Sequence, residues 1–258
     1  MNGIRTIIVA FSMFSAIPMP RAEWTPASMR YAMCAFPLVG AVTGGLCWGW
    51  YALCGLLGLP GMVQAAGLCL IPVAVTGGIH LDGFCDTCDA LASHAQPWRK
   101  QEILKDPHIG AFAAIGLVCY LLLSFALCSS FQPDGKSLGA LTFGFVLSRC
   151  LSGLAIASFP LAKDTGLAHT FAQASDQKTV RLVLSLFAIV LAAGAIFSCG
   201  AAGIGISAAA AVTFIYYRLR LISKFGGLSG DLAGWFLQIC EIIMLAAVVL
   251  VQHLEGMI

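Results

Sequence analysis

Three aspartates stand close together in the stretch Gly77–Asp89, in a chain of 258 residues of which only 10% are charged. They are Asp82, Asp86 and Asp89, separated by four and three residues. On a helix these spacings place the carboxylates within about 60° of one another on one face. Such a cluster of like charges requires a cation, and carboxylates that leave room for water or phosphate suit Mg²⁺. We therefore predict the three aspartates as magnesium ligands, with Asp106 as a further ligand or as a group that orients them.

The residues around these aspartates suit a reaction at a phosphate. His80 has a side chain that ordinarily titrates near neutral pH, so it could accept a proton from an attacking hydroxyl, or bind metal or phosphate instead. Gly77, Gly78 and Gly83 allow close approach of a bulky phosphorylated ligand, and they equally allow tight helix packing. The alternative for the whole stretch is a solvated loop between membrane spans. Three carboxylates on one face beside a histidine disfavour it.

The composition is that of a membrane protein. Hydrophobic residues make up 59% of the chain, and the mean hydropathy is +0.91, both too high for a soluble domain. We expect residues 1–258 to form a single integral-membrane domain whose surroundings are the lipid bilayer. The net charge of +2 gives no reason to expect a nucleic-acid partner.

Seven apolar runs are long enough to cross the bilayer core, which takes about 20 residues of helix. They cover Tyr31–Leu57, Met62–Ile79, Ile109–Ser130, Leu138–Phe159, Leu182–Cys199, Ala201–Tyr217 and Leu232–Val251. An earlier run, Thr6–Ile17, lacks a small-residue cleavage site and is expected to be a short interfacial or re-entrant helix rather than a signal peptide. The predicted fold class is all-α: a polytopic helical membrane protein of about seven spans.

The basic residues are concentrated in every second loop, and this distribution indicates how the spans are oriented in the membrane. Seven spans bring nearly all of them to one side, which the positive-inside rule assigns to the cytoplasm. These residues are Arg5, Arg21, Arg30, Arg99, Lys100, Lys105, Lys163, Lys178, Arg181, Arg218, Arg220 and Lys224. The aspartate-bearing loop, residues 77–110, then faces the cytoplasm.

Two charges lie inside predicted spans, Arg149 and Glu241. Ionisable groups at membrane depth are costly and usually functional. The two residues either take part in the site, where a guanidinium would match phosphate oxygens, or pair with each other as a structural ion pair. A second glycine-and-aspartate segment, Lys224–Asp231, lies on the same predicted side as the aspartate cluster and is expected to close over it.

Most of the eleven cysteines lie in apolar runs, where cysteine behaves as a small hydrophobe, so reduced thiols are expected. Cys85 and Cys88 form a C-x-x-C pair that raises a zinc or redox alternative. On the predicted helix they point away from the aspartates, and a zinc site would need two more good ligands.

The chain resembles the cobalamin synthase family, the adenosylcobinamide-GDP ribazoletransferases, at several stretches. Residues 77–90 read GGIHLDGFCDTCDA, and Glu102–Phe112 reads EILKDPHIGAF. The stretches Phe14–Pro20, Phe36–Gly40 and Lys224–Asp231 also match, so the resemblance covers nearly the whole chain. The chain departs from the family pattern at Gln238, where a glutamate is expected.

This resemblance implies the last assembly step of cobalamin biosynthesis. A hydroxyl of α-ribazole, or of its 5′-phosphate, attacks the cobinamide-linked phosphate of adenosylcobinamide-GDP, and GMP leaves in a Mg²⁺-dependent reaction. The location implied is the bacterial cytoplasmic (inner) membrane, with the active site facing the cytoplasm.

On this hypothesis each polar residue has a role. The metal ligands are Asp82, Asp86, Asp89 and Asp106; the catalytic residues are His80, Lys105 and Arg149; the substrate-binding residues are Lys224, Asp231 and Glu241.

Other functions use similar residues. A CDP-alcohol phosphotransferase or a prenyltransferase-like lipid enzyme also uses spaced aspartates with Mg²⁺, but the full motifs of both are missing here. A cation transporter would place its carboxylates at the bilayer midplane rather than at a boundary. The glycine-rich fifth and sixth spans also permit a homodimer.

Overall fold

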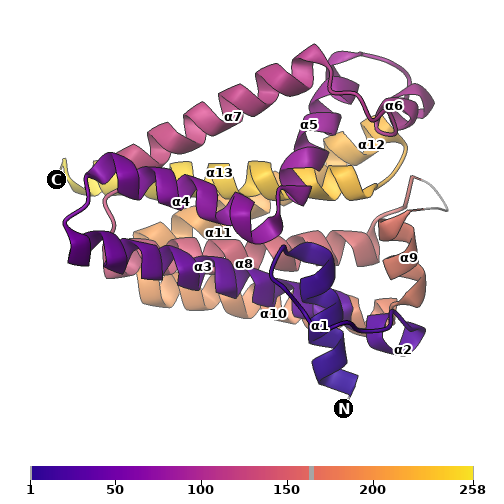
Figure 1. Ribbon diagram of the computed structural model, residues 1–258, viewed down its shortest axis with the longest axis horizontal. Coiled ribbons are helices and arrows are strands. Elements are labelled where there is room, and N and C mark those ends of the chain that lie inside the picture. The colour runs from indigo at the N-terminus through magenta and orange to yellow at the C-terminus, as the bar shows by residue number, and fades with distance from the viewer. Residues whose placement is uncertain (1, 163–165, 258) are drawn as a thin grey trace.

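The computed structural model describes residues 2–162 and 166–257, and its long helices run side by side along the longest axis (Figure 1). The described chain forms thirteen α-helices and one π-helical segment. Their bounds are α1 Asn2–Phe14, α2 Pro26–Met29, α3 Ala32–Leu57, α4 Gly61–Thr76, α5 Ile79–Ala92, α6 Pro97–Ile103, α7 Ala111–Ser130, α8 Gly135–Ser158, α9 Leu167–Ala174, α10 Gln177–Cys199, α11 Ala201–Tyr216, η1 Tyr217–Leu221, α12 Ile222–Phe225 and α13 Gly230–Glu255.

Six of these elements are long and apolar enough to cross a membrane. They are α3, α7, α8, α10, the continuous stretch from α11 to α12, and α13. A seventh crossing is reached if the bent pair α4 and α5 is counted as one span. The predicted polytopic all-α fold is confirmed, with each predicted span matched by one helix to within a few residues.

The bent pair differs from a simple span. The second predicted span ends at Ile79, whereas α4 ends at Thr76 and the chain turns by 93° into α5. Gly77 and Gly78 make this turn with φ of 63° and 80°, values that glycine adopts without strain. Because α5 leaves α4 nearly at a right angle and carries the aspartates, we treat it as lying along the membrane boundary, outside the spanning segments.

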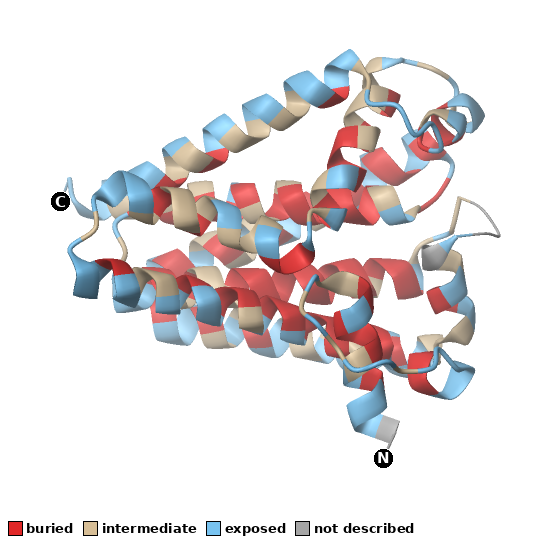
Figure 2. Cartoon of the chain, in the orientation of Figure 1, coloured by how far each residue is buried: buried red, intermediate tan, exposed pale blue. Residues whose placement is uncertain are grey.

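Buried residues are concentrated on the central helices of the bundle, and exposed residues on the outer ones (Figure 2). Most of α8 is buried, whereas α7 and α10 expose most of their length. The exposed side chains on α7 and α10 are large and apolar, including Ile115, Leu122, Leu186 and Phe197. Helices that are apolar on their outer faces need lipid around them, since water would be a poor solvent for that surface.

The centre of the bundle is held by glycine contacts. A Cβ on Gly40 of α3 would lie 2.3 Å from the carbonyl oxygen of Phe145 in α8, so only glycine lets these two helices approach so closely. Gly203 of α11 has the same relation to Ala195 of α10, at 2.0 Å from its carbonyl oxygen. That glycine contact therefore serves packing within the chain, and the homodimer stays a prediction.

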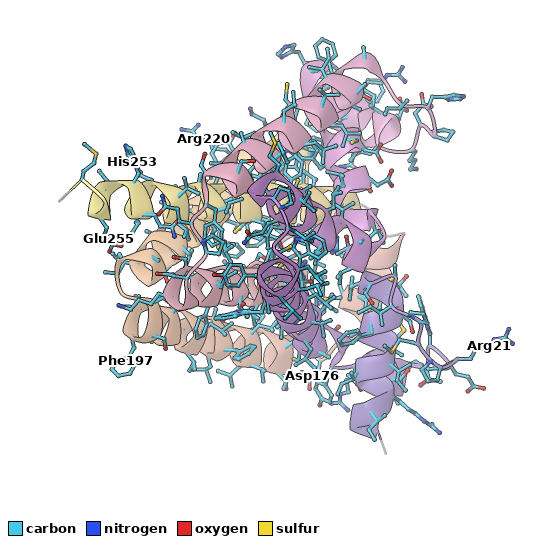
Figure 3. The ribbon with its side chains drawn as sticks, turned by 60° about the vertical axis from the view of Figure 1, so that its left-hand side comes forward. Arg21, Asp176, Phe197, Arg220, His253 and Glu255 are labelled. Carbon is cyan, nitrogen blue, oxygen red and sulfur yellow. The ribbon has the colours of Figure 1, made fainter. Side chains whose placement is uncertain are left out.

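Basic segments gather at one end of the bundle. The elements α2, α6 and α12 lie at the end that carries α5, and the C-terminus lies at the opposite end (Figure 1). In Figure 3, Arg21 lies far from His253 and Glu255, and Phe197 points outward from the helices. Lys163, counted above among the basic loop residues, lies outside the described residues. The basic elements α6 and α12 thus share the end of the bundle that carries the aspartates of α5.

The predicted N-terminal element is α1, which packs against α3. Two residues after α1, Ala16 donates its backbone N–H to the carbonyl oxygen of Val75 at the end of α4. This bond lies directly before the turn into α5, so α1 supports the segment that carries the aspartates. All eleven cysteines are free thiols, as expected from their positions.

Candidate active site

The site is built where α5 crosses α13 at backbone contact distance. A Cβ on Gly83 of α5 would lie 2.7 Å from the Cα atom of Asp231, and one on Gly234 of α13 would lie 2.8 Å from the carbonyl oxygen of His80. Any side chain at either position would force the two helices apart. The crossing brings Asp231 of the C-terminal helix beside the aspartates of α5, which are about 145 residues earlier in the chain.

A short backbone bridge holds the beginning of α13. The N–H of Ala162 donates to the carbonyl oxygen of Leu228 over 2.9 Å, and the N–H of Leu228 donates to Pro160 over 2.8 Å. Ser229 then caps α13 by accepting the N–H of Leu232. Within the segment Lys224–Asp231, Asp231 lies beside the aspartates of α5, and closure of the whole segment over them stays a prediction.

Asp82 and Asp86 face an open cleft of about 470 Å³. They are one helical turn apart on α5, and the loop after α6 forms the opposite wall of the cleft. The lining residues are Gly77, Gly78, Ile79, Leu81, Asp82, Cys85, Asp86, Pro107, His108, Ile109 and Leu117. This cleft is large enough for phosphate groups to reach the two carboxylates.

Crowding of negative charge perturbs Asp86. Partial burial, and then the neighbouring carboxylates of Asp82, Asp231 and Asp89 in this order, together raise its pKa to about 6. An aspartate with such a pKa is being pushed toward the protonated form at neutral pH. A bound cation would relieve the same repulsion without a proton.

Asp89 caps another helix. Its carboxylate accepts the N–H of Gly110 over 2.7 Å and the N–H of Ala113 over 2.9 Å, at the N-terminus of α7. A Cβ on Gly110 would lie 2.5 Å from both carboxylate oxygens, so glycine is needed there. Both oxygens thus satisfy backbone donors that would otherwise be unpaired. Its role as a metal ligand stays a prediction.

Asp106 is exposed beyond the wall of the cleft. Its carboxylate accepts the backbone N–H of His108 over 3.0 Å and contacts the Nδ1 atom of the same residue at 2.7 Å. These hydrogen bonds lower the pKa of Asp106. Lys105 beside it is exposed as well, and its predicted catalytic role stays a prediction.

The four predicted ligands are not gathered at one point. Within the part of the chain that the structure describes, no three His, Cys, Asp or Glu side chains are close enough to hold a metal ion by themselves. Asp89 is held by α7 and Asp106 by His108, which leaves Asp82 and Asp86 as the pair in the cleft. Cys85 and Cys88 belong to no such group either.

His80 lies behind the cleft, at the beginning of α5. It is 6% exposed and its ring lies 5.8 Å from that of Phe36. Burial lowers the pKa of His80 to about 3, with a further contribution from the positive charge of Arg149. The imidazole is therefore neutral at physiological pH and a weak base.

Arg149 and Glu241 form a buried ion pair between α8 and α13. Their side chains are 1% and 9% exposed. The Nη1 atom of Arg149 donates to the Glu241 carboxylate, and Ser148 donates its hydroxyl to the same oxygen over 2.9 Å. Of the two alternatives that the sequence left open for these residues, the structure shows the ion pair. The predicted roles of these residues toward substrate stay predictions.

Lys224 is exposed on α12 and lies near a buried lysine that the sequence did not single out. Lys100 of α6 places its ammonium 5.5 Å from the centre of the Phe225 ring. Burial, and then the charge of Lys224, lower the pKa of Lys100. The neighbouring Gln101 donates to the carbonyl oxygen of Phe225 over 3.0 Å, so α6 is tied to α12.

Ser152 is a second residue that sequence reasoning missed. It is 1% exposed and lies one helical turn after Ser148 on α8. A signal existed, since Ser148, Arg149 and Ser152 form a polar stripe within an apolar span.

These features together define a multi-pass helical membrane protein with clustered carboxylates at its basic end. A family model described as cobalamin-5-phosphate synthase matches residues 6–249. The chain belongs to this family, and the resemblance drawn from the sequence motifs is confirmed.

Curated relatives agree over almost the full length. The adenosylcobinamide-GDP ribazoletransferase of Lachnoclostridium phytofermentans is 41% identical over 98% of this chain and 96% of the relative. Relatives with the same description from Desulfitobacterium hafniense strain Y51 and Clostridium botulinum strain Alaska E43 are 34% and 31% identical, over 95% and 94% of this chain and 96% of each relative. No solved structure matches the chain. Neither a lipid enzyme nor a cation transporter is supported by these comparisons.

Replacing Asp89 by alanine tests its role as a cap. The N–H groups of Gly110 and Ala113 would lose their acceptor, so we expect a loss of about 1–2 kcal/mol of stability. The measurement is the midpoint of thermal unfolding in detergent with a chelator present, which removes any contribution of metal. Asp106→Ala, also an aspartate that accepts a backbone N–H but at an exposed position, serves as control with a smaller shift. Equal midpoints for Asp89→Ala and wild type would contradict the cap.

Replacing one partner of the Arg149–Glu241 pair tests whether the pair is structural. Glu241→Leu leaves a buried unpaired guanidinium and should cost about 3–5 kcal/mol, whereas Arg149→Met combined with Glu241→Leu should recover most of the loss. The fraction of folded protein in detergent against added denaturant reports this. If the double variant is no more stable than Glu241→Leu, the pair is not the reason for the destabilisation. Activity of the recovered double variant then reports whether Arg149 also serves the substrate.

Proposed function

We propose that the chain is an adenosylcobinamide-GDP ribazoletransferase, which joins α-ribazole or its 5′-phosphate to adenosylcobinamide-GDP and releases GMP. The observation that carries this proposal is the cleft of Asp82 and Asp86 at the basic end of a chain that matches its family over nearly its whole length. Phosphoryl-type transfer needs mainly positioning and neutralisation of charge, and a carboxylate pair with nearby lysines has the parts for both.

Asp82 and Asp86 are the residues that we assign to Mg²⁺. The donor set fits this ion, because Mg²⁺ is commonly held by one or two carboxylates while water and substrate phosphate complete its shell. The raised pKa of Asp86 also favours a cation between these side chains. When bound, Mg²⁺ would neutralise the developing charge of the phosphates. Asp89 and Asp106 would hold the structure around this pair in place. Asp89 does so by capping the N-terminus of α7, and Asp106 by its hydrogen bonds to His108.

The remaining polar residues bind and orient the substrates in this proposal. Lys105 and Lys224 are exposed cations at the same end as the cleft and suit the oxygens of the departing GMP. Asp231 of α13 lies beside α5, the helix that carries the two cleft aspartates. His80 is a weak base because of its lowered pKa, so we assign it a hydrogen bond to substrate rather than removal of a proton.

We also propose that the protein lies in the bacterial inner membrane with its active site facing the cytoplasm. Most elements that carry lysines and arginines, among them α6 and α12, lie at the end of the bundle that carries α5 (Figure 1), and the opposite end has short connections such as Leu59–Pro60 and Gly200. The positive-inside rule assigns the basic end to the cytoplasm, where nucleotide-activated substrates are available.

Replacing either cleft aspartate by asparagine tests the metal assignment. Asp82→Asn or Asp86→Asn should lower GMP release from adenosylcobinamide-GDP at least about 100-fold, because loss of one charged ligand weakens both metal binding and charge neutralisation. The assay uses protein reconstituted in lipid with α-ribazole and Mg²⁺. Asp134→Asn is the matched control, since asparagine caps helix α8 at the opposite end as well as aspartate does.

The same assay contains a pH test. A proton on Asp86 competes with the metal, so the Mg²⁺ concentration for half-maximal activity should rise as the pH falls through about 6. Near-normal turnover of both aspartate variants, or turnover unaffected by a chelator, would remove the assignment.

Sealed membrane vesicles test the orientation. Adenosylcobinamide-GDP is large and charged and does not cross a bilayer, so inverted inner-membrane vesicles should release GMP at once. Right-side-out vesicles should do so only after permeabilisation. The reverse pattern would place the cleft on the outer face.

A further inference from the structure

A second cavity lies directly beside the carboxylate cleft, on the other side of Asp82. It measures about 260 Å³ and is enclosed by residues from α1, α3, α5, α8, α9 and α13. Asp82 lines both spaces, and Asp231 lines this one as well. Asp82 therefore stands where the cavity meets the cleft, and Asp231 stands in the wall of the cavity.

Away from those two aspartates the wall of this cavity is uncharged, and aromatic rings form part of it. Phe14, Phe36 and Phe171 line it together with the ring of His80. The ring centres of Phe14 and Phe36 are 4.2 Å apart, those of Phe14 and Phe171 are 5.7 Å apart, and those of Phe36 and His80 are 5.8 Å apart. Such a wall suits a flat, apolar ring system by stacking and edge contacts.

Two polar atoms in the same wall have no hydrogen-bond partner. They are the Nε2 atom of His80 and the Oγ atom of Ser152, on side chains that are 6% and 1% exposed. A buried polar atom without a partner is costly, and proteins normally retain one only where a ligand or water satisfies it. Both residues line this cavity, His80 from α5 and Ser152 from α8.

We propose that this cavity binds the heteroaromatic base of the acceptor nucleoside, a proposal that rests on the function assigned above. The base of α-ribazole is a neutral, bicyclic, largely apolar ring system with one free acceptor nitrogen. Stacking on the phenylalanines accounts for its flat apolar surface, and a hydroxyl or imidazole N–H from Ser152 or His80 matches its single acceptor. With the base in the cavity, the ribose extends past Asp82 and Asp231 toward the cleft, where the phosphates meet the metal ligands.

The same features disfavour a lipid chain as the occupant. A hydrocarbon tail would leave both orphaned polar atoms unsatisfied. The cavity also borders the carboxylates at the basic end of the bundle rather than the lipid-facing surfaces of α7 and α10. We therefore assign it to the base and treat a lipid as an outcome of the test.

The test compares two acceptors of different size. Ile156 lines the cavity, and Ile156→Phe should fill part of it. We expect the KM for α-ribazole to rise at least about tenfold. The KM for the α-riboside of imidazole, a smaller single-ring probe, should change less than threefold, as should the KM for adenosylcobinamide-GDP. Leu154→Phe on the same helix, at a position that does not line the cavity, is the matched control and should leave all three values unchanged.

Ser152→Ala is a second variant that does not depend on overpacking. Loss of one hydrogen bond should raise the KM for α-ribazole about 3- to 10-fold at nearly unchanged kcat. Ser152→Thr, which keeps the hydroxyl, should restore the donor. Equal changes for both acceptors and for adenosylcobinamide-GDP would mean a general disturbance of the site and overturn the proposal, and so would no change in either variant.

Failure of the proposed function gives a different result. If wild-type protein releases no GMP, the ribazoletransferase assignment fails, and equilibrium dialysis of α-ribazole against wild type and Ile156→Phe then tests the cavity alone. Binding to wild type that is weakened at least about tenfold in the variant supports the cavity as a base site. Absence of binding, or a lipid co-purifying with wild type and lost from Ile156→Phe, overturns it.

Discussion

The contact between α5 and α13 is the constraint on which the site depends. Gly83 and Gly234 let the two helices approach until backbone touches backbone, and this approach alone brings Asp231 and the aspartates of α5 into one electrostatic environment. Partial burial, together with the repulsion between these carboxylates, raises the pKa of Asp86, so its ionised form is disfavoured in the isolated protein. Carboxylates that repel one another favour the binding of a cation, and the cation in turn attracts an anionic substrate.

The rest of the bundle secures that contact from three directions. Asp89 connects α5 to the N-terminus of α7, and the pairing of Leu228 with Pro160 and Ala162 fixes the segment before α13. Deeper in the membrane, the Arg149–Glu241 pair sets how α8 and α13 sit against each other. Breaking one member of a buried pair is costly in a low-dielectric interior, so the pair opposes sliding of α13 along α8.

This architecture also explains how a reaction of large polar substrates fits a membrane protein. The two spaces at Asp82, one open and acidic, the other smaller and aromatic, lie at the basic end of the bundle. The spanning helices supply a rigid frame, because their backbone hydrogen bonds are satisfied internally and their outer side chains are apolar. Polar substrates would reach the carboxylates from water while an apolar ring could enter between helices.

The apolar spans and the shared face of Asp82 and Asp86 could be predicted from the sequence, because hydropathy adds up along a segment and helical spacing is a local property. Hydropathy over about 20 residues predicts a span wherever the span packs, and the spacing of Asp82 and Asp86 implies a shared face as soon as α5 is a helix. The same reasoning placed Asp89 on that face but could not show that the N–H groups of Gly110 and Ala113 would take up its carboxylate. It also left the Arg149–Glu241 pairing as one of two alternatives.

The sequence by itself determined the class of protein, its apolar helices, the family and the acidic stretch of α5, since each follows from composition, periodicity or a contiguous motif. Only the tertiary structure decided which carboxylates remain available, that His80 is buried and a weak base, and that Ser152 lines the same cavity as His80. Those properties depend on desolvation and on partners that are distant in the chain. Helix packing creates both, and no window of sequence contains them.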